Sequence, residues 1–121
     1  MARVRAALRR VELPAPQKPR ADFDAGDLRV DFAQQRVYVR GQEIKLTPTE
    51  YRLLSELVQA AGRVLVPEYL LENVWGIGYL GETRLLWQAI HRLRRKIERD
   101  PQNPQVIQTR PGIGYLLIPP D

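Results

Sequence analysis

Residues 82–99 read Glu-Thr-Arg-Leu-Leu-Trp-Gln-Ala-Ile-His-Arg-Leu-Arg-Arg-Lys-Ile-Glu-Arg, and this segment carries the clearest structural pattern of the chain. On a helical wheel, at about 100° per residue, its apolar residues gather on one side. They are Leu86, Ile90, Leu93 and Ile97. The polar residues Arg84, Gln88, His91 and Arg95 lie opposite, with Arg92 on one flank and Trp87 and Arg94 on the other. The spacing predicts a helix over 82–99 with one buried face and one basic face.

The charge of this predicted helix has one sign. No acidic residue occurs between Arg84 and Lys96. An exposed helix usually mixes both signs, because opposite charges one turn apart attract each other. Arginine can pair with guanine or clamp a phosphate, and glutamine can pair with adenine in the major groove. The pattern favours a helix that faces DNA over a solvated face that only carries arginines.

Charge is also segregated along the chain. Residues 84–110 hold seven basic residues against two acidic ones, whereas residues 22–83 hold six against ten. Residues 1–20 hold six basic residues and one acidic residue. Such segregation is typical of proteins that bind nucleic acid.

Composition excludes several classes of function. The chain has 121 residues, no Cys and one His, so it has neither thiol chemistry nor a Cys-ligated zinc. His91 lacks a second His for a metal site, and we expect no metal, no cofactor and no enzymatic activity. No apolar run approaches the roughly 20 residues that span a bilayer. No signal-peptide pattern is present, so we expect a cytoplasmic protein without a membrane partner.

Short elements precede and follow the basic helix. Alternating residues predict strands at 28–32, 37–40 and 43–46. Thr47-Pro48-Thr49-Glu50 predicts a capped helix start, and helical spacing continues to about residue 61, before Gly62. A second helix begins at Pro67 and precedes a loop at 76–81. Two further strands, 106–109 and 115–118, form a hairpin, while the prolines between 12 and 21 indicate an extended linker.

Three further patterns in the sequence could suggest a binding site but have a simpler structural explanation. The loop 76–81 spells G-x-G-x-x-G, but a helix precedes it where a dinucleotide site needs a parallel strand. Asp24, Asp27 and Asp31 could suggest a cation site, but Asp27 and Asp31 alternate with apolar residues, which favours a solvated strand face. The spacing of Tyr51, Tyr69 and Tyr115 predicts packing in the core.

A helix with a basic outer face fits the major groove, and the preceding helix would cross the DNA backbone, as in helix-turn-helix proteins. Arg110 at the hairpin tip is then a candidate for the minor groove. The alternatives are a non-specific nucleic-acid module, including an RNA binder, and a protein-docking module.

Motifs over about residues 22–118 resemble the C-terminal winged-helix DNA-binding (effector) domain of OmpR/PhoB-type response regulators. The matching segments are Leu46-Thr47-Pro48-Thr49-Glu50-Tyr51-Arg52-Leu53-Leu54, Gly62-Arg63-Val64-Leu65, Leu70-Leu71, Val74-Trp75-Gly76, Arg84, Ile90, Arg92-Leu93-Arg94-Arg95-Lys96-Ile97-Glu98, Asp100-Pro101, Ile107-Gln108-Thr109 and Gly112-Ile113-Gly114-Tyr115. The resemblance implies an α+β winged helix-turn-helix, with a four-stranded N-terminal antiparallel sheet, a three-helix core and a C-terminal β-hairpin wing.

The resemblance also implies domain boundaries and function. Residues 1–21 resemble the end of a receiver-domain helix followed by a linker, and residues 22–121 form the DNA-binding domain. The implied function is sequence-specific binding to double-stranded DNA and control of transcription, with helix 82–99 in the major groove and wing 106–118 near the minor groove. Two protomers would bind tandem repeat sites as a dimer. The implied protein partners are RNA polymerase, the receiver domain of the parent protein and a sensor histidine kinase.

Roles are implied for individual residues. Arg84 and Arg94 match phosphate-binding positions, and Gln88, His91 and Arg92 match groove-facing ones. Trp75 matches a tryptophan that touches the backbone. The loop that meets RNA polymerase would consist of Gly76, Ile77, Gly78, Tyr79, Leu80 and Gly81.

The chain departs from the family pattern in its central helix. Leu85-Leu86-Trp87-Gln88-Ala89 stands where many members have Thr-Val-Asp-Val-His, so the common phosphate-binding His is Ala89 and the common Asp is Trp87. Trp87 can stack on a sugar, pack on a thymine methyl or pack on a neighbouring loop, and these alternatives stay open. In the wing, Pro111 replaces the common Arg, and Arg110 lies one residue earlier.

Overall fold

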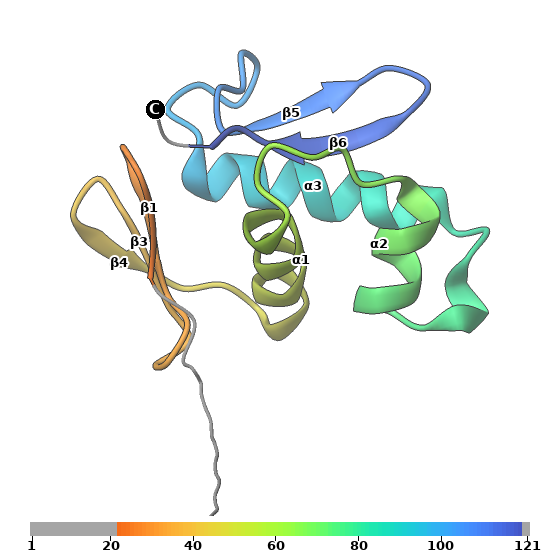
Figure 1. Cartoon of the computed structure of the whole chain (residues 1–121), viewed down its shortest axis with the longest axis horizontal. Helices are drawn as coiled ribbons and strands as arrows, with labels where there is room; N and C mark the ends of the chain where they lie inside the picture. Colours follow the sequence, from red (N-terminus) through yellow and green to blue (C-terminus); the bar gives the residue numbers. More distant parts are fainter. Residues whose placement is uncertain (1–21, 120–121) are drawn as a thin grey trace, which may run out of the picture.

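A computed structural model describes residues 22–119 of the chain, so the predicted receiver-helix end and linker at 1–21 lie outside the described residues. Figure 1 shows a sheet at one end, three helices in the middle and a hairpin lying along the third helix. The α+β winged-helix architecture predicted from the sequence is confirmed. Among residues 22–119, none of the helices combines the length and the apolar composition that crossing a bilayer requires.

The N-terminal sheet is an antiparallel meander of four strands in the order β1-β2-β3-β4. The strands are β1 (Phe23–Ala25), β2 (Leu28–Asp31), β3 (Arg36–Val39) and β4 (Gln42–Ile44). Alternation predicted the last three, and the family resemblance implied a fourth. β1 spans three residues, which is too short for a period-two pattern to identify.

Register places one face of the sheet against the helices. Leu28 pairs with Val39 and Val30 with Val37, and all four side chains are buried in the core. Arg40 and Gly41 join β3 to β4 with φ angles of 50° and 82°, the left-handed geometry of a tight hairpin turn. The sheet therefore covers one end of the helical core.

Helix α1 (Pro48–Gln59) begins as predicted. The Thr47 side chain accepts the N–H of Glu50 at 3.1 Å, and Glu50 Oε1 accepts the N–H of Thr47 at 2.9 Å. The helix ends two residues before the predicted position, because the N–H of Ala61 bonds to Val58 and Gly62 then reverses the chain at φ 87°. Helix α2 (Pro67–Val74) follows and buries Leu70, Leu71 and Val74.

Helix α3 (Thr83–Ile97) is the predicted basic helix. Its apolar side is buried as the wheel predicted: Leu86, Ile90, Leu93 and Ile97 are each at most 1% exposed. It ends two residues early because the buried Glu98 leaves helical geometry. The Glu98 carboxylate instead accepts the backbone N–H groups of Gln105, Val106 and Ile107 at 2.8–3.1 Å.

The C-terminal hairpin consists of β5 (Ile107–Arg110) and β6 (Gly114–Leu117), paired from Ile107↔Leu117 to Arg110↔Gly114. Its free edge is partly covered by the connection between α1 and α2. Leu65 and Tyr115 exchange backbone hydrogen bonds at 2.8 and 3.0 Å. The hairpin is thus fastened to the core on this edge.

Two sequence expectations outside the helix are wrong. Asp27 lies in the turn between β1 and β2 rather than on a strand face, and it binds Arg99 beyond α3 at 2.6 Å and Arg40 at 3.3 Å. Tyr69 is exposed and donates a hydrogen bond to Glu56 at 2.9 Å instead of packing in the core. Tyr51 and Tyr115 do pack against the core.

The close approach at Gly114 leads to a prediction. A Cβ at Gly114 would overlap the backbone carbonyl of Leu65, and backbone cannot move aside as a flexible side chain can. We expect Gly114→Ala to cost about 2–3 kcal/mol and to lower Tm by roughly 10–20 °C in thermal unfolding followed by circular dichroism. Gly78, which has open space and ordinary φ, is the matched control. Equal melting of Gly114→Ala and Gly78→Ala would contradict this packing.

Candidate nucleic-acid interface

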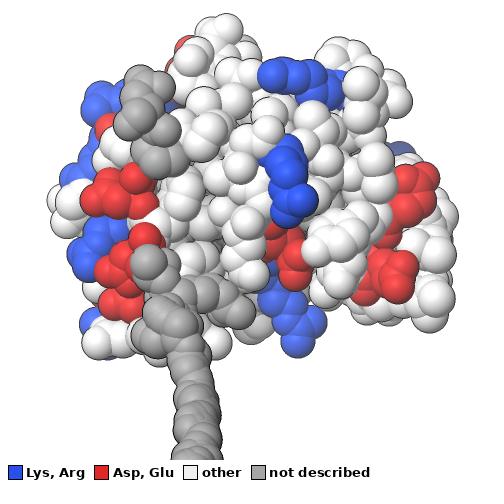
Figure 2. All heavy atoms as spheres, viewed as in Figure 1, with Lys and Arg blue, Asp and Glu red and all other residues white. Residues whose placement is uncertain are grey.

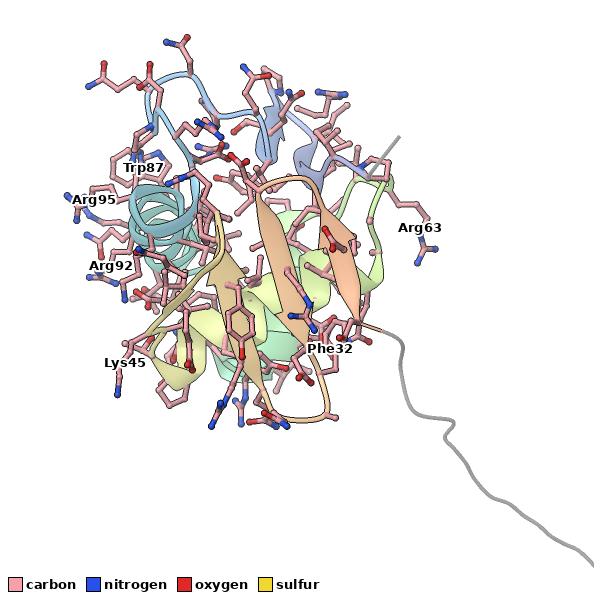
Figure 3. The ribbon with its side chains drawn as sticks, turned by 90° about the vertical axis from the view of Figure 1, so that its left-hand side faces the viewer. Phe32, Lys45, Arg63, Trp87, Arg92 and Arg95 are labelled. Carbon is pink, nitrogen blue, oxygen red and sulfur yellow. The ribbon has the colours of Figure 1, made fainter. Side chains whose placement is uncertain are left out.

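The outer face of α3 carries the basic strip, which we define as Arg84, Gln88, His91, Arg92 and Arg95. All are exposed except Gln88, which is half-buried. Arg92 and Arg95 point to the left in Figure 3, away from the body of the protein. The structure thus places on one surface the residues that the wheel grouped together.

The arginines of the basic strip lack acidic partners within the described residues. Arg84, Arg92 and Arg95 form no ion pair with any carboxylate of residues 22–119. By contrast, five basic side chains elsewhere in the described part of the chain each pair with a carboxylate, for example Arg29 with Asp22 at 3.0 Å. Several acidic side chains are visible on the opposite face, over the strands at the left and near α2 at the right (Figure 2). An unpaired cationic surface is free to attract an anion.

Lys96 of α3 stabilises the fold through contacts with Glu50 and Lys45. Its Nζ atom lies 2.6 Å from Glu50 Oε1 and 3.1 Å from the carbonyl oxygen of Lys45. Burial would raise the pKa of Glu50, but hydrogen bonds from Lys96 and Thr47, with the charge of Lys96, hold the pKa below its ordinary value. This contact joins α3 to the start of α1.

Arg94 points toward the hairpin. Its Nε and Nη2 atoms donate to the carbonyl oxygen of Ile107 at 3.2 and 3.0 Å, and Nη2 also donates to Thr109 Oγ1 at 2.9 Å. Burial lowers the pKa of the guanidinium below its ordinary value. Arg94, to which the resemblance assigns a phosphate, is therefore engaged in positioning β5 in this structure.

Trp87 is 54% exposed and lies beside the basic strip. Its ring meets the His91 ring edge-on, with centroids 4.1 Å apart and planes at 62°. Together Thr83, Arg84, Trp87 and Tyr115 line a hollow of about 450 Å³ between α3 and β6, which we call the helix–hairpin hollow. Sequence reasoning had not assigned Tyr115 or Thr83 to the site, because only the fold brings β6 next to the start of α3.

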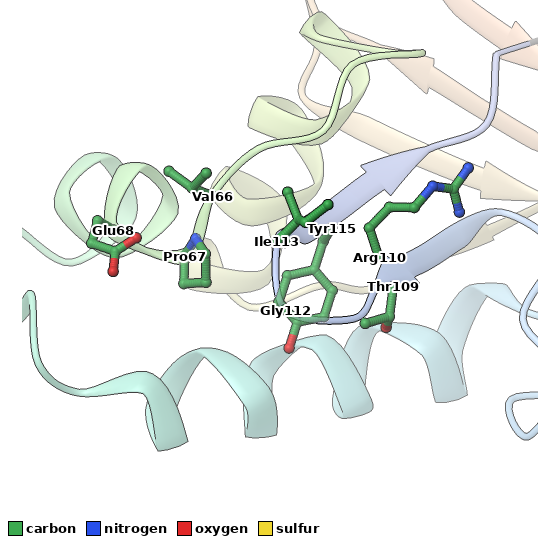
Figure 4. A pocket seen from close by; sticks show the side chains of 9 residues that line it. Val66, Pro67, Glu68, Thr109, Arg110, Gly112, Ile113 and Tyr115 are labelled. Carbon is green, nitrogen blue, oxygen red and sulfur yellow. The ribbon is translucent and has the colours of Figure 1, made fainter.

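The hairpin presents Arg110 at the end of β5. Arg110 is exposed and donates to Gln108 Oε1 at 3.3 Å. A second hollow, of about 540 Å³, lies between the start of α2 and the hairpin turn. Among the side chains that line it, Tyr115 points toward α3 and Arg110 points away from α3 (Figure 4). Arg110 thus lies on the wing but not beside the basic strip.

Trp75 and the following loop lie at the end of α2. Trp75 is half-buried and packs against the core, which leaves only part of its ring accessible. Residues 76–81 contain the short 3-10 helix η1 (Ile77–Tyr79) and follow α2, as predicted, rather than a strand. Ile77, Tyr79 and Leu80 are exposed, Ile77 by 72%. An exposed apolar cluster of this kind is typical of protein contacts.

Comparison with known proteins identifies the family to which the chain is similar. The family model described as "Transcriptional regulatory protein, C terminal" matches residues 41–117. The DNA-binding response regulator MtrA of Mycolicibacterium smegmatis is 42% identical over 120 residues, which cover 99% of this chain and 51% of that protein. The transcriptional regulatory protein AfsQ1 of Streptomyces coelicolor is 43% identical over 119 residues, covering 98% and 51%. The chain spans about half the length of these relatives.

Solved structures agree with the fold. The response regulator DrrB of Thermotoga maritima, an OmpR/PhoB homolog, superposes with a TM-score of 0.76 at 33% identity, over 84% of this chain and 46% of that one. The RstA DNA-binding domain of Klebsiella pneumoniae, solved with the RstA box, gives a TM-score of 0.75 at 31% identity, over 83% and 99%.

The fold and the unpaired basic strip define a winged-helix DNA-binding domain. The chain belongs to the family of C-terminal domains of transcriptional regulatory proteins, the OmpR/PhoB-type effector domains.

The Lys96–Glu50 contact leads to a pH prediction. Because the pKa of Glu50 is below its ordinary 4.5 in the folded protein, its ionised form stabilises the fold above that pH, and this contribution is lost as pH falls through the folded-state value. We expect Glu50→Gln to lower Tm at neutral pH, and the difference from wild type to shrink as pH falls below the ordinary 4.5. Glu43→Gln, which alters an exposed carboxylate 3.8 Å from Arg36, is the control. A difference in Tm that stays constant with pH would refute this role.

Proposed function

We propose that residues 22–121 bind double-stranded DNA sequence-specifically, as the effector domain of a two-component response regulator that controls transcription. α3 enters the major groove, and the hairpin β5–β6 lies at the adjacent minor groove. The observation that carries this proposal is the unpaired basic strip, whose three arginines have no carboxylate partner among residues 22–119. A family match and a DNA-bound structural neighbour support it.

Within this proposal the residues divide by their place on α3. Arg84, in the first turn, is suited to a phosphate, because the first turn holds no acidic residue and Glu82 makes no capping bond there. Gln88, His91 and Arg92 lie along the centre, where side chains reach base edges.

The remaining candidates lie at the edges of this surface. Arg95 extends the same surface, Arg94 acts by holding β5, and Arg110 approaches the minor groove from the wing. Trp75 contributes the accessible part of its ring.

The whole protein has further proposed partners. A receiver domain, joined through residues 1–21, would respond to a sensor histidine kinase, and two protomers would bind tandem repeats as a dimer. The loop 76–81 would contact RNA polymerase, and its exposed Ile77, Tyr79 and Leu80 support that role. We propose a cytoplasmic, non-enzymatic protein. Non-specific nucleic-acid binding or protein docking alone is the alternative.

Two arginine variants test the assignment together. Arg92→Ala is expected to cost about 1–3 kcal/mol on the preferred duplex and to blur sequence preference, because a base contact is lost. Arg84→Ala is expected to weaken all duplexes alike and to reduce the slope of log K against log salt by about one, because a phosphate contact is lost. The measurement is a titration, at several salt concentrations, of duplexes selected from a random library.

Arg63→Ala is the matched control, since Arg63 is exposed and points to the opposite side of the molecule (Figure 3). It is expected to bind as wild type does. If Arg84→Ala and Arg92→Ala also bound every duplex as wild type does, the proposed function would be wrong. If both variants weakened all duplexes without changing sequence preference, the non-specific alternative would hold.

A further inference from the structure

The helix–hairpin hollow has an unusual lining for a charged DNA surface. It combines two aromatic rings, from Trp87 and Tyr115, with the guanidinium of Arg84 and the hydroxyl of Thr83. Trp87 leaves more than half of its surface in water, although an indole gains free energy when it is covered. The hollow therefore offers an apolar wall next to a cation, and this combination matches a sugar attached to a phosphate.

The position of Trp87 on α3 is defined by its neighbour Arg94. Residues seven apart lie on nearly the same line along a helix. Since Arg94 reaches Ile107 and Thr109 of β5, this line faces the hairpin, and Trp87 lies on it two turns earlier. In Figure 3 Trp87 lies on the side of α3 toward the hairpin, whereas Arg92 lies on the other side. Trp87 thus faces the gap between helix and wing rather than the floor of the major groove.

The occupant of that gap follows from the geometry of DNA. In a duplex the major and the minor groove are separated by one sugar–phosphate strand. If α3 lies in the major groove and the hairpin at the adjacent minor groove, this strand has to cross between them. The helix–hairpin hollow lies at that crossing, so the group that reaches it is a backbone nucleotide and not a base edge.

We propose that the helix–hairpin hollow is a deoxynucleotide subsite, in which the rings of Trp87 and Tyr115 pack on one deoxyribose and Arg84 binds the adjoining phosphate. The proposal rests on the proposed function and adds a contact to the sugar. The edge-on contact with His91 holds the indole in place, and the exposed part of Trp87 is available to a sugar. A ribose at this position would press its 2′-hydroxyl against aromatic carbon, where it loses its hydrogen bonds to water. The subsite therefore selects DNA over RNA at one nucleotide.

The test is a scan of single ribonucleotides along the strand that crosses the hollow. The preferred duplex is prepared as a series in which one position at a time carries ribose, and Kd is measured for wild type and Trp87→Ala. Wild type is expected to lose roughly tenfold in affinity at one position, or at two neighbouring ones, relative to the rest of the series. Trp87→Ala is expected to bind the all-DNA duplex more weakly, to keep the wild-type salt slope, and to show no such position.

Two further variants complete the design. Trp87→Phe keeps an aromatic wall and is expected to retain the sensitive position with a smaller loss. Arg63→Ala alters an exposed side chain on the opposite side of the molecule (Figure 3) and is expected to reproduce the wild-type scan. Because Trp87 is exposed, its replacement leaves the core intact, and circular dichroism checks this.

The outcomes separate the subsite from the proposed function. A scan with the same profile in wild type and Trp87→Ala overturns the subsite, while sequence-specific binding by α3 stands. A thymine-to-uracil replacement that weakens wild type but not Trp87→Ala also overturns it, because Trp87 then reads a methyl group. If wild type binds no selected duplex, the subsite falls together with the proposed function.

Discussion

The structure depends on the burial of one apolar stripe along α3. Leu86, Ile90, Leu93 and Ile97 are almost completely removed from water, and each contributes about 1.5–3 kcal/mol relative to exposure. The stripe packs on α1 and α2 and fixes the rotation of the helix about its own axis. The opposite side of α3 then has to face solvent, whatever residues it carries. The position of the basic strip is therefore a consequence of the core.

The cations of this region divide into two groups by what they contact. Lys96 and Arg94 of α3 reach α1 and β5, and Arg99, just beyond the helix, reaches the β1–β2 turn, so the three side chains join this region to its neighbours. Arg84, Arg92 and Arg95 form no ion pair with any carboxylate among residues 22–119. Some basic side chains of α3 are therefore engaged in the fold, and others remain available for the proposed DNA contact. The contacts of each residue, not its type, separate the two groups.

Short-range sequence patterns predicted those structural features that depend only on residues close together in the chain. The capping box at Thr47 and Glu50 and the buried stripe of α3 follow from spacings of a few residues, and both are confirmed. The end of α3 and the role of Arg94 could not be predicted in this way, because both depend on residues 105–109 folding back along the helix. Glu98 did offer a signal: a carboxylate at a helix C-terminus opposes the dipole, so it needs compensating donors.

The two departures from the family pattern in α3 are connected through the structure. Ala89, at the position of a common phosphate-binding His, is 3% exposed, so a small residue here fits against the core and offers no polar contact to DNA. Trp87, at the position of a common Asp, replaces a carboxylate that would repel phosphate with an exposed ring. One change removes a polar contact from the surface of α3, and the other adds an apolar contact on the flank that faces β6. In the proposed subsite, the two changes together shift contacts from the outer face of α3 toward the hairpin, where the group within reach is a backbone nucleotide rather than a base edge.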